Sequence, residues 1–404
     1  MSKLFDVAII GGGIIGTAVG MSLQKDKNLS VILIEAENKF APHQTGNNSG
    51  VIHSGLYYKP GSLKAKNCIE GRELMYRFCE DNNIQFSRCG KIVIAVNNNE
   101  VAALHELEKR GWENGLKGLK RISKEEIKEY EPYAEGILGL FVPETGIVDY
   151  TSVTEKYVEL IKLHGGTVQT STKFLNLVKQ NGEMIMETNK GEIKTRVLVN
   201  CAGLQSDRVA QICGIKPNLQ IIPFRGEYFS LVKEKEYLVR NLIYPVPDPK
   251  FPFLGVHFTR MIKGGIEAGP NAVLSFKREG YKKYDFSLPD TLQMFTYGGF
   301  WEMASKHYKM GFKEFYRSFN KSQFVSGLQN LVPAIQGSDI YPGGAGVRAQ
   351  ALEPDGKLVD DFRIIEAENM VHVLNAPSPA ATASISIGKT IAGYTMQRYN
   401  EAKN

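Results

Sequence analysis

Cysteine is scarce in this sequence, and its few cysteines are not spaced as pairs. They stand at positions 68, 79, 89, 201 and 213 of a 404-residue chain, an odd number without a C-x-x-C pair. This spacing excludes a disulfide framework and a zinc site of the usual kinds. It is typical of a protein from a reducing compartment, and we expect no metal site.

Long hydrophobic runs suited to a membrane are also missing. The most apolar uncharged stretch near the N-terminus extends from Val7 to Leu23, and it is interrupted by glycines at 11, 12, 13, 16 and 20. These glycines would weaken a lone helix in lipid. The only basic side chain before the stretch is Lys3, which does not fit a signal peptide. We therefore expect no targeting or membrane-spanning segment, and a cytoplasmic protein.

A strong charge of one sign is absent as well. Lys and Arg number 49 against 43 Asp and Glu, and the net charge of +6 is spread along the chain without basic blocks. We therefore expect no nucleic-acid partner, and the small excess favours anionic ligands or an anionic surface. The hydrophobic fraction of 43% is that of a packed globular protein, and the length suits two or three domains.

The N-terminal region has the pattern of a βαβ unit. An apolar run at 6–10 is followed by Gly11-Gly12-Gly13-Ile14-Ile15-Gly16, a helix-compatible segment and a second apolar run at 31–34. The glycines fit G-x-G-x-x-G, and Glu35 follows the second strand. Such glycines admit a pyrophosphate, helix N–H groups bind it, and the acid accepts a hydrogen bond from the ribose. The motif predicts an adenine dinucleotide, either NAD or FAD.

The position of the motif favours FAD. Candidate strands of the nucleotide-binding layer recur near residues 195 and 371, which suggests a cofactor domain interrupted by a substrate domain, as is usual in flavoproteins. A second glycine-rich run at 44–55 offers hydroxyl, amide and backbone donors for a diphosphate and a flavin edge, although alone it could be an ordinary loop.

We predict an α/β and α+β fold. It consists of a Rossmann-like FAD-binding domain, of the glutathione-reductase-like βαβ type, with an inserted antiparallel-sheet substrate domain. The FAD-binding domain is expected to be discontinuous and to comprise residues 1–85, 148–223 and 340–404, and the substrate-binding domain to comprise residues 86–147 and 224–339. A closing helix is expected from Ser384 to Tyr399.

Residues 295–324 interleave aromatic and basic side chains. This pattern is typical of a basic amphipathic surface helix that docks on anionic lipid, on the inner face of the cell membrane, and reaches quinone. A helix packed on the substrate sheet would explain the aromatic residues equally well.

Several sequence blocks resemble the L-2-hydroxyglutarate oxidase/dehydrogenase family. They are HQTGNNSGVIHSGLYYKPGSLKAK at 43–66, TGIVDY at 145–150, and residues 255–260, 267–272, 346–352 and 375–382. The resemblance spans almost the whole chain and places it in the D-amino-acid-oxidase-like FAD superfamily. It implies hydride transfer from C2 of L-2-hydroxyglutarate to N5 of FAD, giving 2-oxoglutarate, with electrons passed to quinone or oxygen.

Two other functions stay open at this stage. One is an FAD-dependent oxidase or dehydrogenase for an amino acid or glycerol 3-phosphate, and the other is a flavin-binding regulatory protein without turnover. The presence of both His53 and Arg348 argues against the second, because a sensor has no evident need for a base and a carboxylate clamp.

Oxidation of a secondary alcohol requires a base for the hydroxyl proton. His53 is the first choice because its block is expected to border the flavin, although a structural histidine in that loop is the alternative. His257 is the second choice. Strand alternation places His257 and Thr259 on one face and Phe258 and Arg260 on the other, so Arg260 reaches the site only if a bulge intervenes.

Arg348 stands where related amine oxidases of the superfamily keep a carboxylate-binding arginine. Its guanidinium fork suits a carboxylate, and an ion pair with Asp355 or Asp360 is the alternative. Lys66 could serve the distal carboxylate, although a solvated helix face explains it as well. The residues expected to bind substrate are His53, Tyr58, Lys66, His257, Thr259, Arg260, Arg348 and Thr382.

FAD is expected to dissociate, because no cysteine follows Cys213 to bind it covalently; a histidyl link through His43 or His53 stays open. The helix start at 382–384 is expected to stabilise the reduced flavin. The residues expected to contact FAD are Gly11, Gly13, Ile14, Ile15, Gly16, Glu35, Ala36, Thr45, Asn48, Ser49, Gly50, Val51, His53, Ala202, Gly203, Gly344, Gly346, Arg348, Thr382, Ala383 and Ser384.

Overall fold

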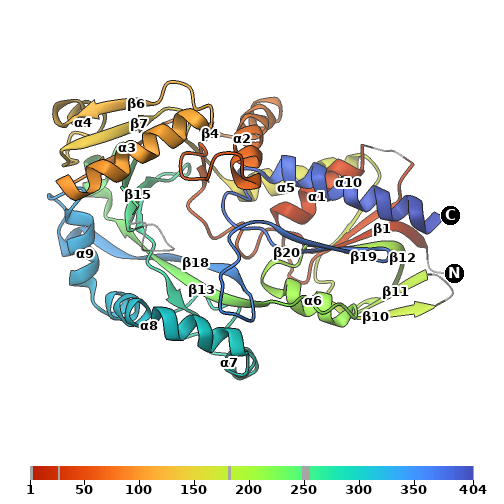
Figure 1. Ribbon diagram of the computed structural model, residues 1–404. Coiled ribbons are helices and arrows are strands. Elements are labelled where there is room, and N and C mark those ends of the chain that lie inside the picture. Colours follow the sequence, from red (N-terminus) through yellow and green to blue (C-terminus); the bar gives the residue numbers. More distant parts are fainter. Residues whose placement is uncertain (1–2, 26–27, 181–182, 248–254, 404) are drawn as a thin grey trace.

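The computed structural model describes residues 3–25, 28–180, 183–247 and 255–403, and it contains two large sheets and one small one (Figure 1). The first large sheet has eight strands. They are β1 (Leu4–Ile10), β2 (Val31–Ile34), β9 (Thr167–Gln169), β10 (Phe174–Gln180), β11 (Glu183–Thr188), β12 (Gly191–Asn200), β19 (Arg363–Ala367) and β20 (Met370–Asn375).

The first sheet assembles strands that are far apart in the sequence. β1 lies between β2 and β12 and is parallel to both, and β9 extends the sheet beyond β2. The first half of β12 pairs with the antiparallel β11, and its second half pairs with the parallel β20. The predicted return of the chain to this layer near residues 195 and 371 is therefore confirmed.

Helices α1 (Ile14–Leu23), α5 (Tyr150–Leu163) and α10 (Ser384–Lys403) pack together over one face of this sheet (Figure 1). Their apolar side chains form one buried cluster with the alternate residues of β1, β2 and β12. Close packing depends on Gly388, because a Cβ there would meet the backbone of Ala18 in α1 at 2.7 Å. The predicted βαβ unit and closing helix are both present.

The second large sheet has nine strands and is antiparallel except for one parallel pair, β5 with β14. Its strands are β17 (Val273–Leu274), β13 (Gln220–Leu231), β16 (Ile266–Gly269), β15 (His257–Arg260), β14 (Leu242–Pro245), β5 (Lys91–Ala95), β7 (Leu138–Val142), β6 (Lys120–Ser123) and, beside β13, β18 (Ile340–Leu352). Helices α7 (Leu288–Phe295), α8 (Gly298–Phe319) and α9 (Lys321–Gln329) border it on one side, as Figure 1 shows.

The place of β18 differs from the boundary expected at residue 340. Residues 340–352 pair with β13 over nearly their whole length, in the second sheet and not in the first. β13 and β18 are long enough to contribute to two hydrophobic cores. At one end, Ile221 and Ala351 pack beside Leu374 of β20; at the other end, Leu231 and Ile340 pack with Phe324 of α9. The pairing of β18 with β13 therefore differs from what a boundary at 340 would suggest, and the domain division itself stays a prediction.

The remaining strands and α-helices lie around the two large sheets. They are the small sheet of β3 (Val51–Ile52), β8 (Gly146–Val148) and β4 (Phe86–Ser87), and the helices α2 (Leu63–Asp81), α3 (Asn98–Glu113), α4 (Lys124–Tyr130) and α6 (Ser206–Ile212). Of the helices that the structure describes, none is both long and apolar enough to cross a bilayer.

Candidate active site

The glycine-rich turn after β1 has no room for side chains at two of its glycines. Gly11 has a φ of +113°, and a Cβ there would clash with the carbonyl oxygen of Cys201. A Cβ at Gly16 would clash with the carbonyl oxygen of Gly11, so the first turn of α1 packs directly on the strand end. The backbone is therefore open to a ligand at the N-terminus of α1, as a pyrophosphate requires.

Glu35 fixes this turn from the end of β2. Its carboxylate is buried and accepts hydrogen bonds from Gly12 N at 2.6 Å and from Glu37 N at 2.9 Å. A carboxylate has about four acceptor sites, so both bonds leave capacity for ribose hydroxyls. The residue after it, Ala36, is exposed beside the turn.

The second glycine-rich run lies against the same helix start. Thr45 Oγ1 accepts a hydrogen bond from Ile14 N at 3.1 Å. Asn48 stabilises the run internally, because its amide donates to two backbone carbonyls and its Oδ1 accepts from Gly50 N at 2.8 Å. Gly50 itself has a φ of +66°, and a Cβ there would approach Val148 O at 2.6 Å.

This run also reaches the loop after β12 and the middle of β18. Gln44 Oε1 accepts a hydrogen bond from Ala349 N at 3.2 Å, and the Gln44 amide lies beside Gly203. A Cβ at Gly346 would approach the carbonyl oxygen of Asn47 at 2.5 Å. The structure thus brings together segments that contain residues predicted to contact FAD: 11–16, 44–51, 202–203 and the part of β18 around Gly346 and Arg348. Their glycine cradle, at which the backbone carries no side chains, fits a dinucleotide.

The segment before α10 lies beside His53. Thr382 Oγ1 accepts a hydrogen bond from His53 N at 3.0 Å and is bonded to Tyr150 OH at 3.0 Å. Ser384, the first residue of α10, is bonded through its hydroxyl to Tyr157 OH at 3.1 Å. The N-terminus of a 20-residue helix therefore lies next to the loop that carries His53.

The loop around His53 is held by two further helices. The carbonyl oxygen of His53 accepts a hydrogen bond from Cys68 Sγ of α2 at 3.3 Å. The next carbonyl oxygen, of Ser54, accepts one from Arg72 Nη1 of the same helix at 2.9 Å. Asn114, after α3, donates to the carbonyl oxygens of Gly55 at 3.0 Å and Tyr58 at 2.9 Å. These bonds fix the backbone that positions the imidazole.

Across from His53, one face of the second sheet carries a row of polar side chains. The row comes from five different strands and consists of Lys91 (β5), Tyr244 (β14), His257 (β15), Tyr228 (β13) and Arg348 (β18). The rings of Tyr244 and His257 lie 4.0 Å apart between centroids, and Lys91 Nζ lies 5.0 Å from the Tyr244 ring centroid. Tyr57 covers the other side of this ammonium group, at 4.2 Å. Charges on Lys91 and Arg348 act on both histidines.

Both histidines are neutral at pH 7. Burial, together with the charges of Lys91, His257 and Arg348, lowers the pKa of His53 to about 3. Burial also lowers the pKa of His257 to about 4, where Arg348 and Lys91 add to the effect and a hydrogen bond to Gly255 O at 3.0 Å opposes it. A neutral imidazole has one nitrogen that can accept a proton, which is what alcohol oxidation requires.

Some predicted substrate residues lie elsewhere. Arg260 follows the expected alternation without a bulge in β15, and its guanidinium donates to Ser87 Oγ at 3.0 Å, away from the row. Lys66 is exposed on α2. Tyr58 does join the site, because its hydroxyl bonds to Ser378 and its ring region faces Arg348 and Tyr244. Thr259 is buried and bonded to Tyr244.

Three residues of the row were not predicted from the sequence: Lys91, Tyr228 and Tyr244. Lys91 begins the apolar run Lys91-Ile92-Val93-Ile94-Ala95, of which all five residues are buried. A lysine in a fully buried strand is rare, and this was the available signal. No comparable signal marks the two tyrosines, because tyrosine is common in strands.

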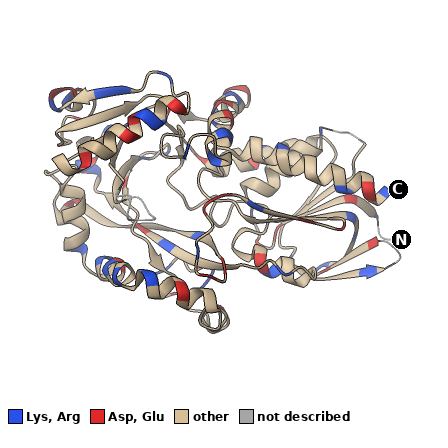
Figure 2. Ribbon diagram, viewed as in Figure 1, with Lys and Arg blue, Asp and Glu red and all other residues tan. Residues whose placement is uncertain are grey.

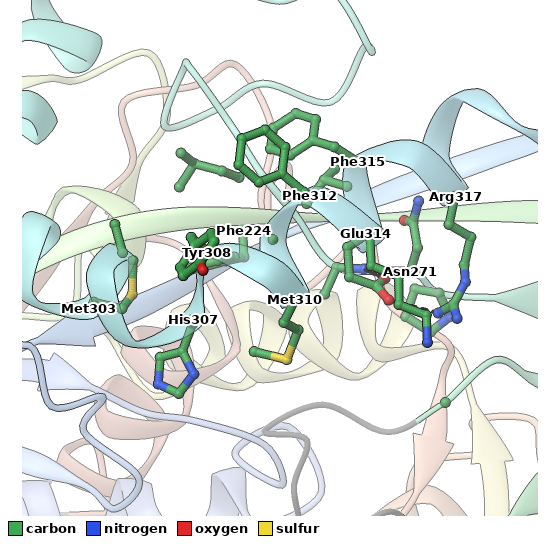
Figure 3. Close-up of a pocket in the computed structure, with 18 of the residues that line it drawn as sticks. Phe224, Asn271, Met303, His307, Tyr308, Met310, Phe312, Glu314, Phe315 and Arg317 are labelled. Atoms are coloured by element: carbon green, nitrogen blue, oxygen red, sulfur yellow. Dashed lines mark hydrogen bonds and ion pairs between the residues drawn. The ribbon is translucent and has the colours of Figure 1, made fainter.

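A separate cavity of about 500 Å³ lies beneath α8. It is lined mostly by apolar side chains, among them Phe224, Val256, Met303, Met310, Phe312 and Phe315. Figure 3 shows Tyr308, Met310 and Phe312 of α8 around it, with Asn271 and Arg317 near one end. It includes none of His53, Lys91, His257 and Arg348, so it is distinct from the polar row.

One group of possible metal ligands occurs among the described residues. Atoms of Glu37, His43 and Glu279 lie within 4.8 Å of one another at a partly exposed position. Exposed acidic groups of this kind are common without an ion, and His43 is already bonded to Tyr281 OH at 3.2 Å. The expectation of no metal site stays a prediction.

Known proteins resemble this chain over its whole length. An L-2-hydroxyglutarate dehydrogenase of Indibacter alkaliphilus is 55% identical over 98% of this chain and 100% of its own. The mitochondrial L-2-hydroxyglutarate dehydrogenase of Homo sapiens is 44% identical over 98% of this chain and 89% of its own. These relatives confirm the family resemblance seen in the sequence blocks.

Solved structures agree with the fold. The dithionite-reduced L-alpha-glycerophosphate oxidase of Mycoplasma pneumoniae, which has FAD bound, superposes with a TM-score of 0.79 at 22% identity, over 98% of this chain and 95% of that one. Glycine oxidase of Geobacillus kaustophilus gives a TM-score of 0.73 at 16% identity, over 98% and 96%. The sequence profile described as "FAD dependent oxidoreductase" matches residues 6–394, and the chain belongs to this family of FAD-dependent enzymes.

Proposed function

We propose that the protein oxidises L-2-hydroxyglutarate to 2-oxoglutarate. The observation that carries the proposal is that the neutral, partly buried His53 lies close enough to two cationic side chains, Arg348 and Lys91, for their charges to act on it. This arrangement suits an alcohol flanked by carboxylates. The names of the relatives at 55% and 44% identity support the same substrate.

FAD, when bound, supplies the oxidant that takes two electrons and the C2 hydrogen from the substrate. The segments 11–16, 44–51, 202–203 and 346–349, with Glu35, are the residues that would hold it. The helix start at Ser384 suits negative charge, because the positive end of the helix dipole lies there. We expect non-covalent binding, since burial raises the pKa of the nearby Cys201 thiol to about 12 and keeps it unreactive.

His53 removes the hydroxyl proton in this proposal. Its backbone is held by Thr382, so its imidazole has a fixed position beside the substrate. A pKa of about 3 keeps the ring unprotonated before the substrate arrives. The carboxylates of the substrate then bring negative charge close to the ring, which raises this pKa and favours proton transfer. Arg348 orients the substrate by pairing with its C1 carboxylate.

Anaerobic reduction of the bound flavin tests this function. L-2-hydroxyglutarate should bleach the flavin absorption band rapidly, and D-2-hydroxyglutarate should leave it unchanged. Bleaching by an amino acid or by glycerol 3-phosphate instead would identify the protein as an oxidase or dehydrogenase for that substrate. An oxidised spectrum with all of these compounds would point to a flavin-binding protein without turnover.

We further infer that electrons leave to a lipid-soluble quinone at a membrane surface, with oxygen as the alternative acceptor. One stripe of α8 exposes large aromatic side chains, each between 54% and 74% exposed: Trp301, Tyr308, Phe312, Tyr316 and Phe319. Lysines 306, 309 and 313 and Arg317 flank this stripe along α8, and Figure 2 shows basic residues along the helix. Aromatic and basic side chains together favour anionic lipid headgroups.

Vesicle binding tests the membrane part of the proposal. The protein should co-sediment with vesicles containing phosphatidylglycerol, and less with phosphatidylcholine alone. Replacing Phe312 and Phe319 by serine should weaken binding at least about tenfold, given the apolar area lost. Trp112→Ser, a 52% exposed aromatic on α3, is the matched control. Equal binding by both variants, or no binding to either vesicle, would refute docking through α8.

A further inference from the structure

Lys91 is buried, and no described residue gives it an anionic partner. Its side chain is 2% exposed, and the rings of Tyr57 and Tyr244 lie 4.2 and 5.0 Å from its Nζ. Across the described ranges 3–25, 28–180, 183–247 and 255–403, no residue forms a salt bridge or hydrogen bond with this Nζ. A buried cation that lacks a carboxylate costs free energy, so packing alone does not explain a lysine at this position.

The groups around Lys91 are neutral or positive. They are Tyr57 and Tyr244 over the ammonium group, the Cys68 thiol, and, farther along the row, His53, His257 and Arg348. Burial lowers the pKa of Lys91 to about 7 and keeps the pKa of Cys68 near 12, so the thiol is not a counter-ion. The charged ammonium group of Lys91 therefore has no compensating carboxylate among the described residues.

The two cations act on the histidines in different proportions. Among the charged groups, Lys91 has the largest effect on the pKa of His53, whereas Arg348 has the largest effect on the pKa of His257. Lys91 and Arg348 also come from opposite sides of the row, from β5 and β18, with β14, β15, β16 and β13 between them. A ligand lying along the row would meet one cation near each end.

We propose that Lys91 binds the distal carboxylate of the substrate and selects 2-hydroxy dicarboxylates over 2-hydroxy monocarboxylates. This inference rests on the proposed function and deepens it. The carboxylate supplies the missing counter-charge, and the tyrosine rings on two sides limit the ammonium group to the direction of the row. Arg348 is left for the C1 carboxylate, which all 2-hydroxy acids share.

The proposal is tested by measuring the KM of two substrates with the wild-type protein and with the variant Lys91→Met. L-2-hydroxypentanoate has the carbon chain of L-2-hydroxyglutarate and lacks its distal carboxylate. In Lys91→Met the KM for L-2-hydroxyglutarate should rise roughly 10- to 100-fold, the usual effect of losing a charge-assisted contact. The KM for L-2-hydroxypentanoate should change less than about threefold. Lys162→Met, an exposed lysine at the end of α5, is the matched control and should resemble the wild type.

The flavin spectrum of each variant reports whether the fold is intact. Lys91→Gln provides a second variant that keeps a neutral hydrogen-bond donor, and it should show an intermediate loss restricted to the dicarboxylate. Equal losses on both substrates, or a fall in kcat with KM unchanged, would overturn the inference and place Lys91 in the proton-transfer step. Failure of L-2-hydroxyglutarate to reduce the wild-type flavin is a different result, and it would overturn the proposed function together with this inference.

Discussion

The two large sheets prepare their ligand sites in opposite ways. At the first sheet, the proposed cofactor site is a backbone turn that has no room for side chains at Gly11 and Gly16. At the second sheet, the proposed substrate site consists of long side chains from five strands, including a buried lysine that contacts no carboxylate among the described residues. The first site depends on backbone shape and the second on charge. Substitutions should therefore abolish cofactor binding in one sheet and alter substrate preference in the other.

The largest effect is expected at Gly16, where shape alone should decide. In Gly16→Val the new side chain meets the Gly11 carbonyl oxygen, so α1 cannot pack on the end of β1. We expect FAD content, measured as flavin absorbance per protein, to fall below about a tenth of the wild-type value. Gly393→Ala in α10, where a Cβ has open space, should retain full flavin. Full flavin content in Gly16→Val would contradict the backbone model of this site.

His53→Ala should separate catalysis from cofactor binding. Loss of the general base should slow anaerobic flavin reduction about 10²- to 10⁴-fold. FAD should stay bound, because the glycine-rich turn after β1 is unchanged. Stopped-flow absorbance at the flavin band measures this rate. His257→Ala should slow it less. An unchanged rate in the His53 variant would transfer the role of the base to His257.

Arg348→Met should sharpen the contrast within the row. The C1 carboxylate is present in both L-2-hydroxyglutarate and L-2-hydroxypentanoate, so KM should rise for both, by roughly 10- to 100-fold. Steady-state kinetics on the two substrates gives the comparison. A loss confined to the dicarboxylate would exchange the assignments of Arg348 and Lys91.

The smallest effect is a pH dependence that belongs to the second sheet alone. Burial lowers the pKa of Lys91 to about 7, so the charged form is lost as pH rises through this value. The KM for L-2-hydroxyglutarate should therefore be lowest below pH 7 and rise by up to about tenfold per pH unit above it, until it levels off above the higher pKa that Lys91 has when the carboxylate is bound. The KM for L-2-hydroxypentanoate should show no such rise.

The cofactor site was largely predictable because its signals are local. The turn from Gly11 to Gly16, the acid at 35 and the run at 44–50 each occupy a short stretch, and their spacing follows from strand and helix geometry. The row in the second sheet has no such signal. Lys91, Tyr228 and Tyr244 become neighbours only through strand pairing, which sequence periodicity does not specify. For the same reason the boundary expected at 340 missed the pairing of β18 with β13.

The continuous pair of β13 and β18 has a mechanical consequence. These strands are packed at one end into the apolar core near β20 and at the other into the core near α9, so neither half can separate without breaking their shared ladder. Heating should therefore melt the chain in a single calorimetric transition. FAD, for which we propose a site at the first sheet, should shift that whole transition upwards, so that the cofactor stabilises the substrate half as well.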